Sequence, residues 1–447
     1  MPVLQVAPAF KFGGPYPFGQ GPFGGGPALT GDVVATLPGS TEAETLLGSR
    51  ITSFTFDVLD QQENLIGTLT GVEASGSSLK WSATSAVKGS GSLSCYDIGE
   101  VGGVGQTFTN PVTGVVCNLS QALQWVRIKP WVTISPGDGS QPVDGYNNKY
   151  PLGIWLASAP KSDWSDKGRH WAISLLDKTC LMDRNVILDS SGNAVSYSVP
   201  AGTDIVATVV SIIQNAGEQT PAIQPSSAYG TPLTSTPLTW DAGTSLLQII
   251  NDLLDAGGMF SLWCDYSGQF QITPYNLPAN IPPTYSVLNP FNDVGPSAQS
   301  PDWTYTEDIY SVPNRYVAVA QGSSASMGLI GTATNANGTL PDGTPDPFSY
   351  ASRGYWVTQT EKGVTNCANP AAILAYAQKK LHAAASVVGQ FDLNHLLLPG
   401  LYVNSTVQIT NERAGISTLA AVTDLTMNLD PKALSQSTLR QVVSGVQ

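Results

Sequence analysis

The chain has 447 residues, of which 12% are charged and 42% are hydrophobic, and it contains 45 glycines and 32 prolines. Ordinary soluble domains carry about 25% charged residues and disordered chains reach about 25–30% glycine plus proline, so this composition indicates a folded, turn-rich protein with a weakly charged surface. The 20 basic and 33 acidic residues give a net charge of −13, which disfavours nucleic-acid binding because phosphate recognition needs a basic surface.

Three further features restrict the class of protein. The length predicts about three domains. No apolar run is long enough for a membrane-spanning helix, and the N-terminal residues lack the apolar core of a secretory signal, so we expect neither. The five cysteines are odd in number and form no C-x-x-C pair, which predicts small buried side chains in a protein made in a reducing cytoplasm.

Residues 1–45 form a Gly- and Pro-rich stretch that carries aromatic side chains. Its glycines disfavour regular structure, yet its aromatic residues are too apolar for a solvated tail. Two interpretations stay open, namely a disordered leader and an arm that docks its aromatic side chains on a neighbouring subunit. The candidate subunit-contact residues are Phe10, Phe12, Tyr16, Phe18 and Phe23.

A period of two then predicts a first antiparallel β-domain, a barrel or a sandwich, over residues 46–180. Phe54, Phe56 and Val58 alternate with polar residues, and Trp171, Ile173 and Leu175 are expected on one face of a long hairpin. Predicted strands cover residues 51–60, 65–70, 92–96, 125–134, 150–158 and 170–177. Within residues 125–134, Val126 and Ile128 are expected to oppose Arg127 and Lys129, and Pro130 indicates an edge or a bulge because it cannot donate a ladder hydrogen bond.

The period changes to 3.6 in residues 181–282, which predicts a small α+β domain. Thr203 is the expected cap of a helix over residues 204–216, with Ile205, Val209, Ile212 and Ile213 on its apolar stripe. A second helix is predicted over residues 241–256. Short strands are predicted at residues 259–265 and 269–274.

Residues 283–447 return to strand patterns and predict a second β-domain with one helix. Asn369 and Pro370 are typical of a helix start, and an alanine-rich face (Ala372, Ala375 and Ala383) is expected to allow close packing of that helix. Strands are predicted at residues 316–320, 354–359, 389–395, 401–403, 406–410 and 418–430. The fold class is therefore mainly β with an α+β insertion.

The sequence offers little that is typical of a catalytic or metal site. His170, His382 and His395 have no ligand-type residue at the second or fourth position after them, and neither a nucleophile-elbow nor a phosphate-loop motif occurs. Three carboxylate pairs are candidates for glycoside cleavage by proximity alone, but solvated strand ends, helix faces or turns explain them better: Asp57 with Asp60, Asp252 with Asp255, and Asp302 with Glu307. The Asp/Asn/Gly clusters at residues 137–145 and 341–347 lack the EF-hand spacing. We predict no catalytic, cofactor-binding or metal-binding residues.

Ten tryptophans and long, weakly charged loops remain. They favour either barrel cores or protein–protein contact, where aromatic residues anchor interfaces and charge is depleted. An ordered series of segments then carries a resemblance to a known family. These segments are residues 125–132, 150–156, 171–177, 240–256, 265–270, 274–275, 312–317 and 391–401, together with the helix end at Leu381.

In this series the chain resembles the tail hub, or minor tail protein, family of long-tailed bacteriophages, particularly phages of actinobacteria. Such hubs are similar to the baseplate hubs of contractile phages. The resemblance implies two tube-like antiparallel β-barrel domains that flank the α+β domain. It also implies a homotrimer whose barrels match the sixfold tail tube and adapt it to threefold tip components. The aromatic arm at residues 1–45 departs from the family pattern, and the lack of an appended lysin or fibre domain argues against cell-wall degradation.

The resemblance further implies a non-enzymatic structural protein of the virion tail tip that is synthesised in the host bacterial cytoplasm. The partners it implies are distal tail and tail tube proteins, the tape measure protein, and tail fibre or tip proteins. DNA would pass in transit during ejection without sequence-specific binding, for which a wall without basic clusters is suited. Two alternatives stay open: a distal-tail ring or receptor- or glycan-binding minor tail protein, and a cell-wall glycan hydrolase.

Overall fold

The structure is a computed structural model, and it describes residues 42–96, 106–137, 148–165, 168–223, 233–276, 281–284, 290–293, 297–307, 310–320, 328–339, 344–364, 369–385 and 387–442. The arm residues Phe10, Phe12, Tyr16, Phe18 and Phe23 lie outside these residues. Their role as subunit contacts therefore stays a prediction.

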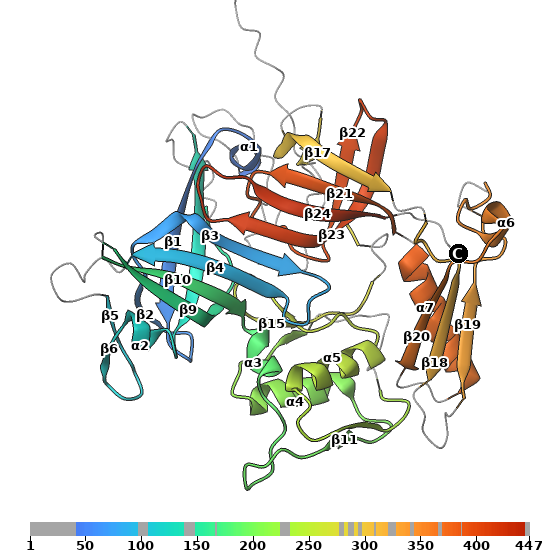
Figure 1. The fold of residues 1–447 in the computed structure, drawn as a ribbon, viewed down its shortest axis with the longest axis horizontal. Helices are drawn as coiled ribbons and strands as arrows, with labels where there is room; N and C mark the ends of the chain where they lie inside the picture. The colour runs from blue at the N-terminus through green and yellow to red at the C-terminus, as the bar shows by residue number, and fades with distance from the viewer. Residues whose placement is uncertain are drawn as a thin grey trace, which may run out of the picture.

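One fourteen-stranded sheet contains strands from both predicted β-domains (Figure 1). The N-terminal segment contributes β1 (Arg50–Leu59), β2 (Leu65–Thr68), β3 (Val72–Ser82), β4 (Gly89–Tyr96), β7 (Arg127–Pro136), β8 (Lys149–Pro151), β9 (Trp155–Ser165) and β10 (Gly168–Asp177). The C-terminal segment contributes β16 (Phe291–Asn292), β17 (Gln299–Glu307), β21 (Val387–His395), β22 (Thr406–Asn411), β23 (Ile416–Asn428) and β24 (Ser435–Val442).

The two segments join through antiparallel pairing of β3 with β23, where Leu79 lies opposite Met427. The main hydrogen-bonded path runs from β17 through β21, β24, β23, β3, β4, β10, β9, β7 and β1 to β2. Leu79 and Met427 are fully buried in one core cluster that draws residues from both segments. The mainly β class with an α+β insertion is thus confirmed, and the described strands of the two predicted barrels share one sheet and one core.

The predicted long hairpin is present as β9 and β10, which pair antiparallel. Its Trp171, Ile173 and Leu175 are buried, as the period of two predicts. On the side of β7 facing away from β1, Ile128 pairs with Trp155 of β9 and Trp131 pairs with Pro151 of β8. Pro130 therefore lies where the partner strand changes, which is the irregular position that its missing N–H predicts.

The α+β unit follows β10 and contains α3 (Thr179–Asp183), β11 (Tyr197–Val199), α4 (Ile205–Asn215), β12 (Ala222–Ile223), β13 (Leu238–Trp240), α5 (Leu246–Ala256), β14 (Trp263–Cys264) and β15 (Phe270–Ile272). Ile205, Val209, Ile212 and Ile213 of α4 are buried against α5 in a separate core cluster. In Figure 1 both helices lie below the large sheet.

Both helix starts in this unit differ from the predicted ones. The cap of α4 is Asp204, whose side chain accepts a hydrogen bond from the backbone N–H of Ala207, whereas Thr203 Oγ1 donates to the carbonyl of Pro200. α5 begins at Leu246 behind a Ser245 cap, because Asp241 and Thr244 form a preceding turn. In each case the residue whose oxygen reaches the orphan N–H groups sets the start.

A further small unit lies between β17 and β21 in sequence, at the right of Figure 1. It contains β18 (Arg315–Ala320), β19 (Ile330–Thr334), α6 (Tyr350–Arg353), β20 (Thr358–Val364) and α7 (Pro370–Ala385). The predicted helix is confirmed, but it covers this three-stranded sheet and its own core rather than the large sheet.

The expected alanine-rich packing face of α7 is wrong for two of its members. Ala375 is exposed and Ala372 is half-buried, whereas Ile373, Ala377 and Leu381 are buried. Close packing comes instead from the sheet side. A Cβ atom at Gly331 of β19 would lie 2.3 Å from the carbonyl oxygen of Ile373, so only glycine lets helix and strand approach this closely.

The remaining described elements are α1 (Glu42–Leu47), the hairpin of β5 (Thr107–Thr109) and β6 (Val116–Asn118), and α2 (Leu119–Ala122). None of the helices in the described part of the chain has both the length and the apolar character to cross a bilayer.

Candidate functional site

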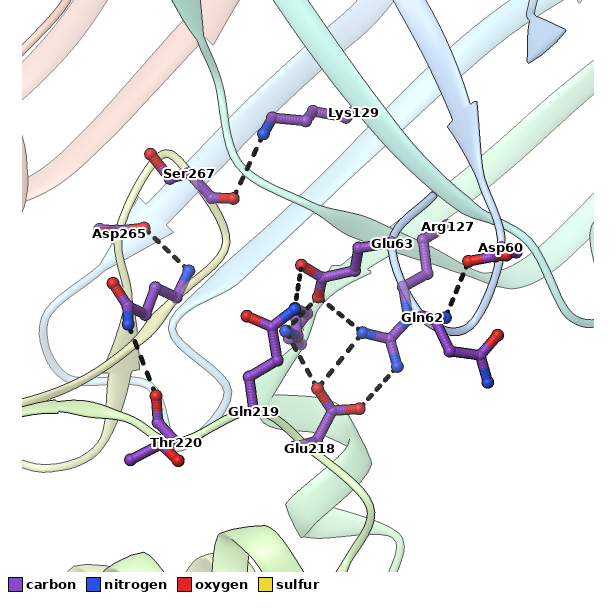
Figure 2. A network of polar contacts seen from close by, with 12 residues as sticks. Asp60, Gln62, Glu63, Arg127, Lys129, Glu218, Gln219, Thr220, Asp265 and Ser267 are labelled. Atoms are coloured by element: carbon purple, nitrogen blue, oxygen red, sulfur yellow. Dashed lines mark hydrogen bonds and ion pairs between the residues drawn. The ribbon is translucent and has the colours of Figure 1, made fainter. Parts of the chain in front are cut away.

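Four charged side chains meet where the large sheet contacts the α+β unit, and we call them the ionic junction: Glu63, Arg127, Lys178 and Glu218 (Figure 2). Glu63 lies in the turn between β1 and β2, Arg127 begins β7, and Lys178 precedes α3. Glu218 lies in the loop after α4. Three sheet-side positions therefore converge on one carboxylate from the helical unit.

Each cation of the ionic junction contacts both carboxylates. Arg127 lies 2.8 Å from Glu63 and 2.6 Å from Glu218, and Lys178 Nζ lies 2.5 Å from Glu63 and 3.0 Å from Glu218. The side chains of Lys178 and Glu218 are only 1% and 6% exposed. Because buried charges are costly unless paired and hydrogen-bonded, this closed arrangement of two cations and two anions can persist away from water.

The charge balance also fixes the protonation of Glu218. Burial acts to raise the pKa of its carboxyl, but the hydrogen bond from Arg127 and the positive charges of Lys178 and Arg127 outweigh burial and hold the pKa below its usual range. Glu218 is therefore ionised at neutral pH.

A cavity of about 600 Å³ adjoins the ionic junction. Its wall consists of the β1–β2 turn, the segment before β7, part of β9, α3 and the loop after α4. Its lining includes Gln61, Gln62, Gln124, Trp125, Leu156 and Leu181.

The same contact between sheet and helical unit continues beside the ionic junction. Lys129 Nζ lies 3.5 Å from the carbonyl oxygen of Ser267 (Figure 2). Tyr402 donates a 2.7 Å hydrogen bond to the carbonyl of Cys264, and Tyr266 donates to the carbonyl of Leu401. The contact is therefore polar on the side of β7 and reaches the C-terminal segment on the other side.

An aromatic cluster fills the point where both sheet segments and the α+β unit meet. Trp81 of β3 packs edge-on against Trp155 of β9 and against Tyr266, with ring centroids 5.3 Å apart in both pairs. Tyr402 lies 4.9 Å from Trp263 and 5.0 Å from Tyr266. These tryptophans belong to a core, whereas Trp164 near the β9–β10 turn is 68% exposed.

The carboxylate pairs named from the sequence make structural contacts. Asp57 accepts a 2.8 Å hydrogen bond from the indole of Trp131, and Asp60 accepts from the backbone N–H groups of Gln62 and Asn64. Asp252 accepts from Trp240 Nε1 at 2.8 Å. Such engaged carboxylates hold turns and indoles in place.

The third pair also has a local contact, since Glu307 accepts from the hydroxyl of Tyr305 at 3.3 Å. Asp302 lies on the exposed part of β17. Residues 138–145 and 341–343 of the two Asp/Asn/Gly clusters lie outside the described residues. Asp346 of the second cluster is buried and accepts a 2.6 Å hydrogen bond from Asn335 Nδ2. Within the described part of the chain, no group of three His, Cys, Asp or Glu side chains is arranged to hold a metal ion.

Two of the histidines and three of the cysteines have partly or fully buried side chains within the described residues. Burial lowers the pKa of His395 to about 4, and its Nε2 and Nδ1 lie 2.7 Å from Ser437 Oγ and from the carbonyl oxygen of Leu396. His170 Nε2 lies 2.7 Å from Ser94 Oγ, and His382 belongs to α7. Cys95, Cys180 and Cys264 are buried, and burial raises the pKa of Cys180 to about 12.

Sequence reasoning missed the ionic junction, and it placed Arg127 on the face opposite the apolar residues of its strand. The structure does alternate these faces, but Arg127 is buried because the α+β unit covers it. Its partner Glu218 lies 91 positions away. One signal was available, because Arg127 lies between the apolar residues Val126 and Ile128 at the start of a strand. Burying an arginine there costs free energy unless a carboxylate pairs with it.

Comparison with protein-family models finds no match, and comparison with curated proteins finds no significant relative. Solved structures do match. The tail protein from Neisseria meningitidis MC58 aligns with a TM-score of 0.54 and 11% identity over 88% of this chain and 98% of its own. The 43 kDa tail protein of prophage MuSo2 from Shewanella oneidensis aligns with a TM-score of 0.50 and 11% identity over 87% of this chain and 98% of its own.

The chain therefore has the fold of phage-type tail proteins, and the resemblance inferred from its ordered sequence segments is confirmed at the level of fold. Both alignments cover nearly all of the matched chain, so the likeness includes the sheet and its inserted units together. An actinobacterial origin stays a prediction.

Proposed function

We propose that this chain is a structural subunit of a phage-type tail tip and that three copies form the hub ring. The observation that carries the proposal is the likeness of fold to two tail proteins over almost their whole length. A match to part of a chain would fit a single domain shared by proteins of different function. A match over almost the whole length fits proteins with the same structural role. The subunit acts through assembly and not through catalysis.

The continuity of the large sheet supports this role. Pairing of β3 with β23 ties the N-terminal and C-terminal segments into one hydrogen-bonded surface. A ring that joins a sixfold tube to threefold components needs two similar contact modules in each subunit, and the two strand-rich segments are our candidates for them. In this proposal the ring contacts distal tail, tail tube, tape measure, and fibre or tip proteins within the virion.

The weak charge of the chain supports passage of DNA without retention. Only 20 residues are basic against 33 acidic ones, and phosphate affinity rises with the number of basic contacts. We infer that the ring encloses a channel through which DNA moves during ejection.

Mass photometry of the purified full chain, across a range of concentrations, tests the proposed ring. We expect particles of three times the chain mass of 46.9 kDa, with an open centre in electron micrographs. Particles of six copies would favour the distal-tail ring instead. A chain that stays monomeric both in solution and in assembled tails would contradict the proposal.

A further inference from the structure

The cavity beside the ionic junction is walled by charges that cancel one another. Glu63, Arg127 and Glu218 line it, and Lys178, which is not part of the lining, pairs with both carboxylates. Because each carboxylate is already paired with two cations, the wall presents no unpaired ion to a ligand. Such a site favours a neutral ligand, since an ionic one would have to compete with contacts that are already made.

Hydrogen-bonding groups around the cavity are unused within the protein. Among the described residues, the side-chain amides of Gln61, Gln62 and Gln124 and the indole N–H of Trp125 have no hydrogen-bond partner. In Figure 2 the amide of Gln62 carries no contact, although its backbone N–H reaches Asp60. Each amide offers both donors and an acceptor, which is the pattern that a hydroxyl group satisfies.

The rest of the lining is apolar. Trp125 is half-buried, and Leu156 and Leu181 are half-buried on β9 and α3. An indole supplies a rigid apolar face together with one polar atom. A pyranose ring has the complementary surface, with an apolar C–H face and a rim of hydroxyl groups. The volume of about 600 Å³ lies within the range of roughly 300–1,000 Å³ that is typical of small-molecule sites.

We propose that this cavity binds a neutral saccharide, with a sugar ring on Trp125 and its hydroxyl groups on the amides of Gln61, Gln62 and Gln124. The ionic junction keeps the sheet side and the helical side of the site at a fixed separation, so the site exists before the ligand binds. All of these residues belong to one subunit, so saccharide binding does not depend on the proposed trimeric hub.

Calorimetric titration of the full chain with maltotriose and with triacetylchitotriose tests the proposal. A uronic-acid trisaccharide and a tri-alanine peptide are the comparison ligands. We expect saturable binding of at least one neutral sugar, and weaker or no binding of the comparison ligands. Trp125→Ala should weaken that binding at least about tenfold, and Gln62→Ala should weaken it measurably.

Trp164→Ala is the matched control, because it removes an equally large and more exposed indole near the other end of β9, and it should leave the affinity unchanged. If Trp125→Ala does not fold, Gln62→Ala and Gln124→Ala decide, since both side chains are exposed. The proposal is overturned if neither sugar binds up to about 10 mM. It is equally overturned if the uronic acid or the peptide binds as tightly, or if the cavity variants that fold bind as the wild type does.

Discussion

Glu218 is the carboxylate that the α+β unit contributes to the ionic junction, and its removal should weaken the contact between this unit and the sheet. Glu218→Gln keeps the shape of the side chain but leaves Arg127 and Lys178 buried with one carboxylate between them. We expect the free energy of unfolding to fall by about 3 kcal/mol, the lower end for a broken buried pair, because Glu63 still contacts both cations.

Urea unfolding at neutral pH measures this loss. Glu412→Gln, at an exposed position in the β22–β23 turn, is the control and should change the free energy of unfolding by less than about 0.5 kcal/mol. Equal stability of the Glu218 and Glu412 variants would show that the four charges do not hold the unit on the sheet.

The raised pKa of Asp177 makes the free energy of unfolding depend on pH with a sign opposite to that expected from the lowered pKa of Glu218. Its complete burial raises the pKa from 3.8 to about 6, although hydrogen bonds from Thr179 and Gly89 and the charge of Lys88 partly offset burial. The folded protein therefore holds this proton more tightly than the unfolded chain does. The stability that Asp177 contributes is fully present below about pH 3.8 and is lost as the pH rises through about 6.

The comparison of wild type with Asp177→Asn isolates this contribution. Between pH 4 and pH 7 the wild type should lose about 2 kcal/mol of unfolding free energy that the variant does not lose. Chemical unfolding at several pH values measures both slopes, with Asp302→Asn on the exposed β17 strand as a control that should follow the wild type. Parallel slopes for the wild type and Asp177→Asn would refute the raised pKa.

At the scale of an element, the packing of α7 on β19 depends on the missing side chain of Gly331. In Gly331→Ala the new Cβ would meet the carbonyl oxygen of Ile373, which is backbone and cannot turn aside. We expect a loss of about 1–3 kcal/mol that is confined to the small unit. Hydrogen exchange should show faster exchange in β18, β19 and α7 and unchanged protection in the large sheet.

Thr332→Ala is the matched control for this variant, because the neighbouring side chain on β19 faces solvent. Protection in the small unit should stay at the wild-type level in that control. If Gly331→Ala also leaves it unchanged, close approach is not what makes glycine necessary at this position.

The elements that could be predicted are those whose own residues carry the signal. The stripe of α4 and the alternation of Leu425 and Met427 in β23 repeat within one element, and each of these apolar side chains is buried. β3 was not predicted because its glycine and serine residues obscure the alternation. Its Leu79 and Trp81 are buried by partners distant in sequence, which include β23 for both and Tyr266 for Trp81. The ionic junction is of the same kind, since no member predicts its partners.

For the whole molecule, the effect of the N-terminal arm on oligomer formation separates its two interpretations, a docking arm and a disordered leader. Replacement of Phe10, Phe12, Tyr16, Phe18 and Phe23 by serine removes the aromatic side chains that the docking interpretation requires. If the arm docks on a neighbouring subunit, the concentration needed for oligomer formation should rise at least about tenfold.

Mass photometry with dilution series measures this shift, and circular dichroism checks the fold. The control replaces the same number of arm prolines by serine, namely Pro8, Pro15, Pro17, Pro22 and Pro27. Unchanged assembly in the aromatic variant would leave the arm as a leader without a docking role.

The central claim is that this chain forms a threefold ring at the tip of a sixfold tube. Cryo-electron microscopy of intact virions, reconstructed without imposed symmetry, tests it most directly by counting copies and tracing their arrangement. The account predicts three copies per tail, placed below the tube with an open bore. Six copies in a ring, or single copies at the periphery of the tip, would contradict it.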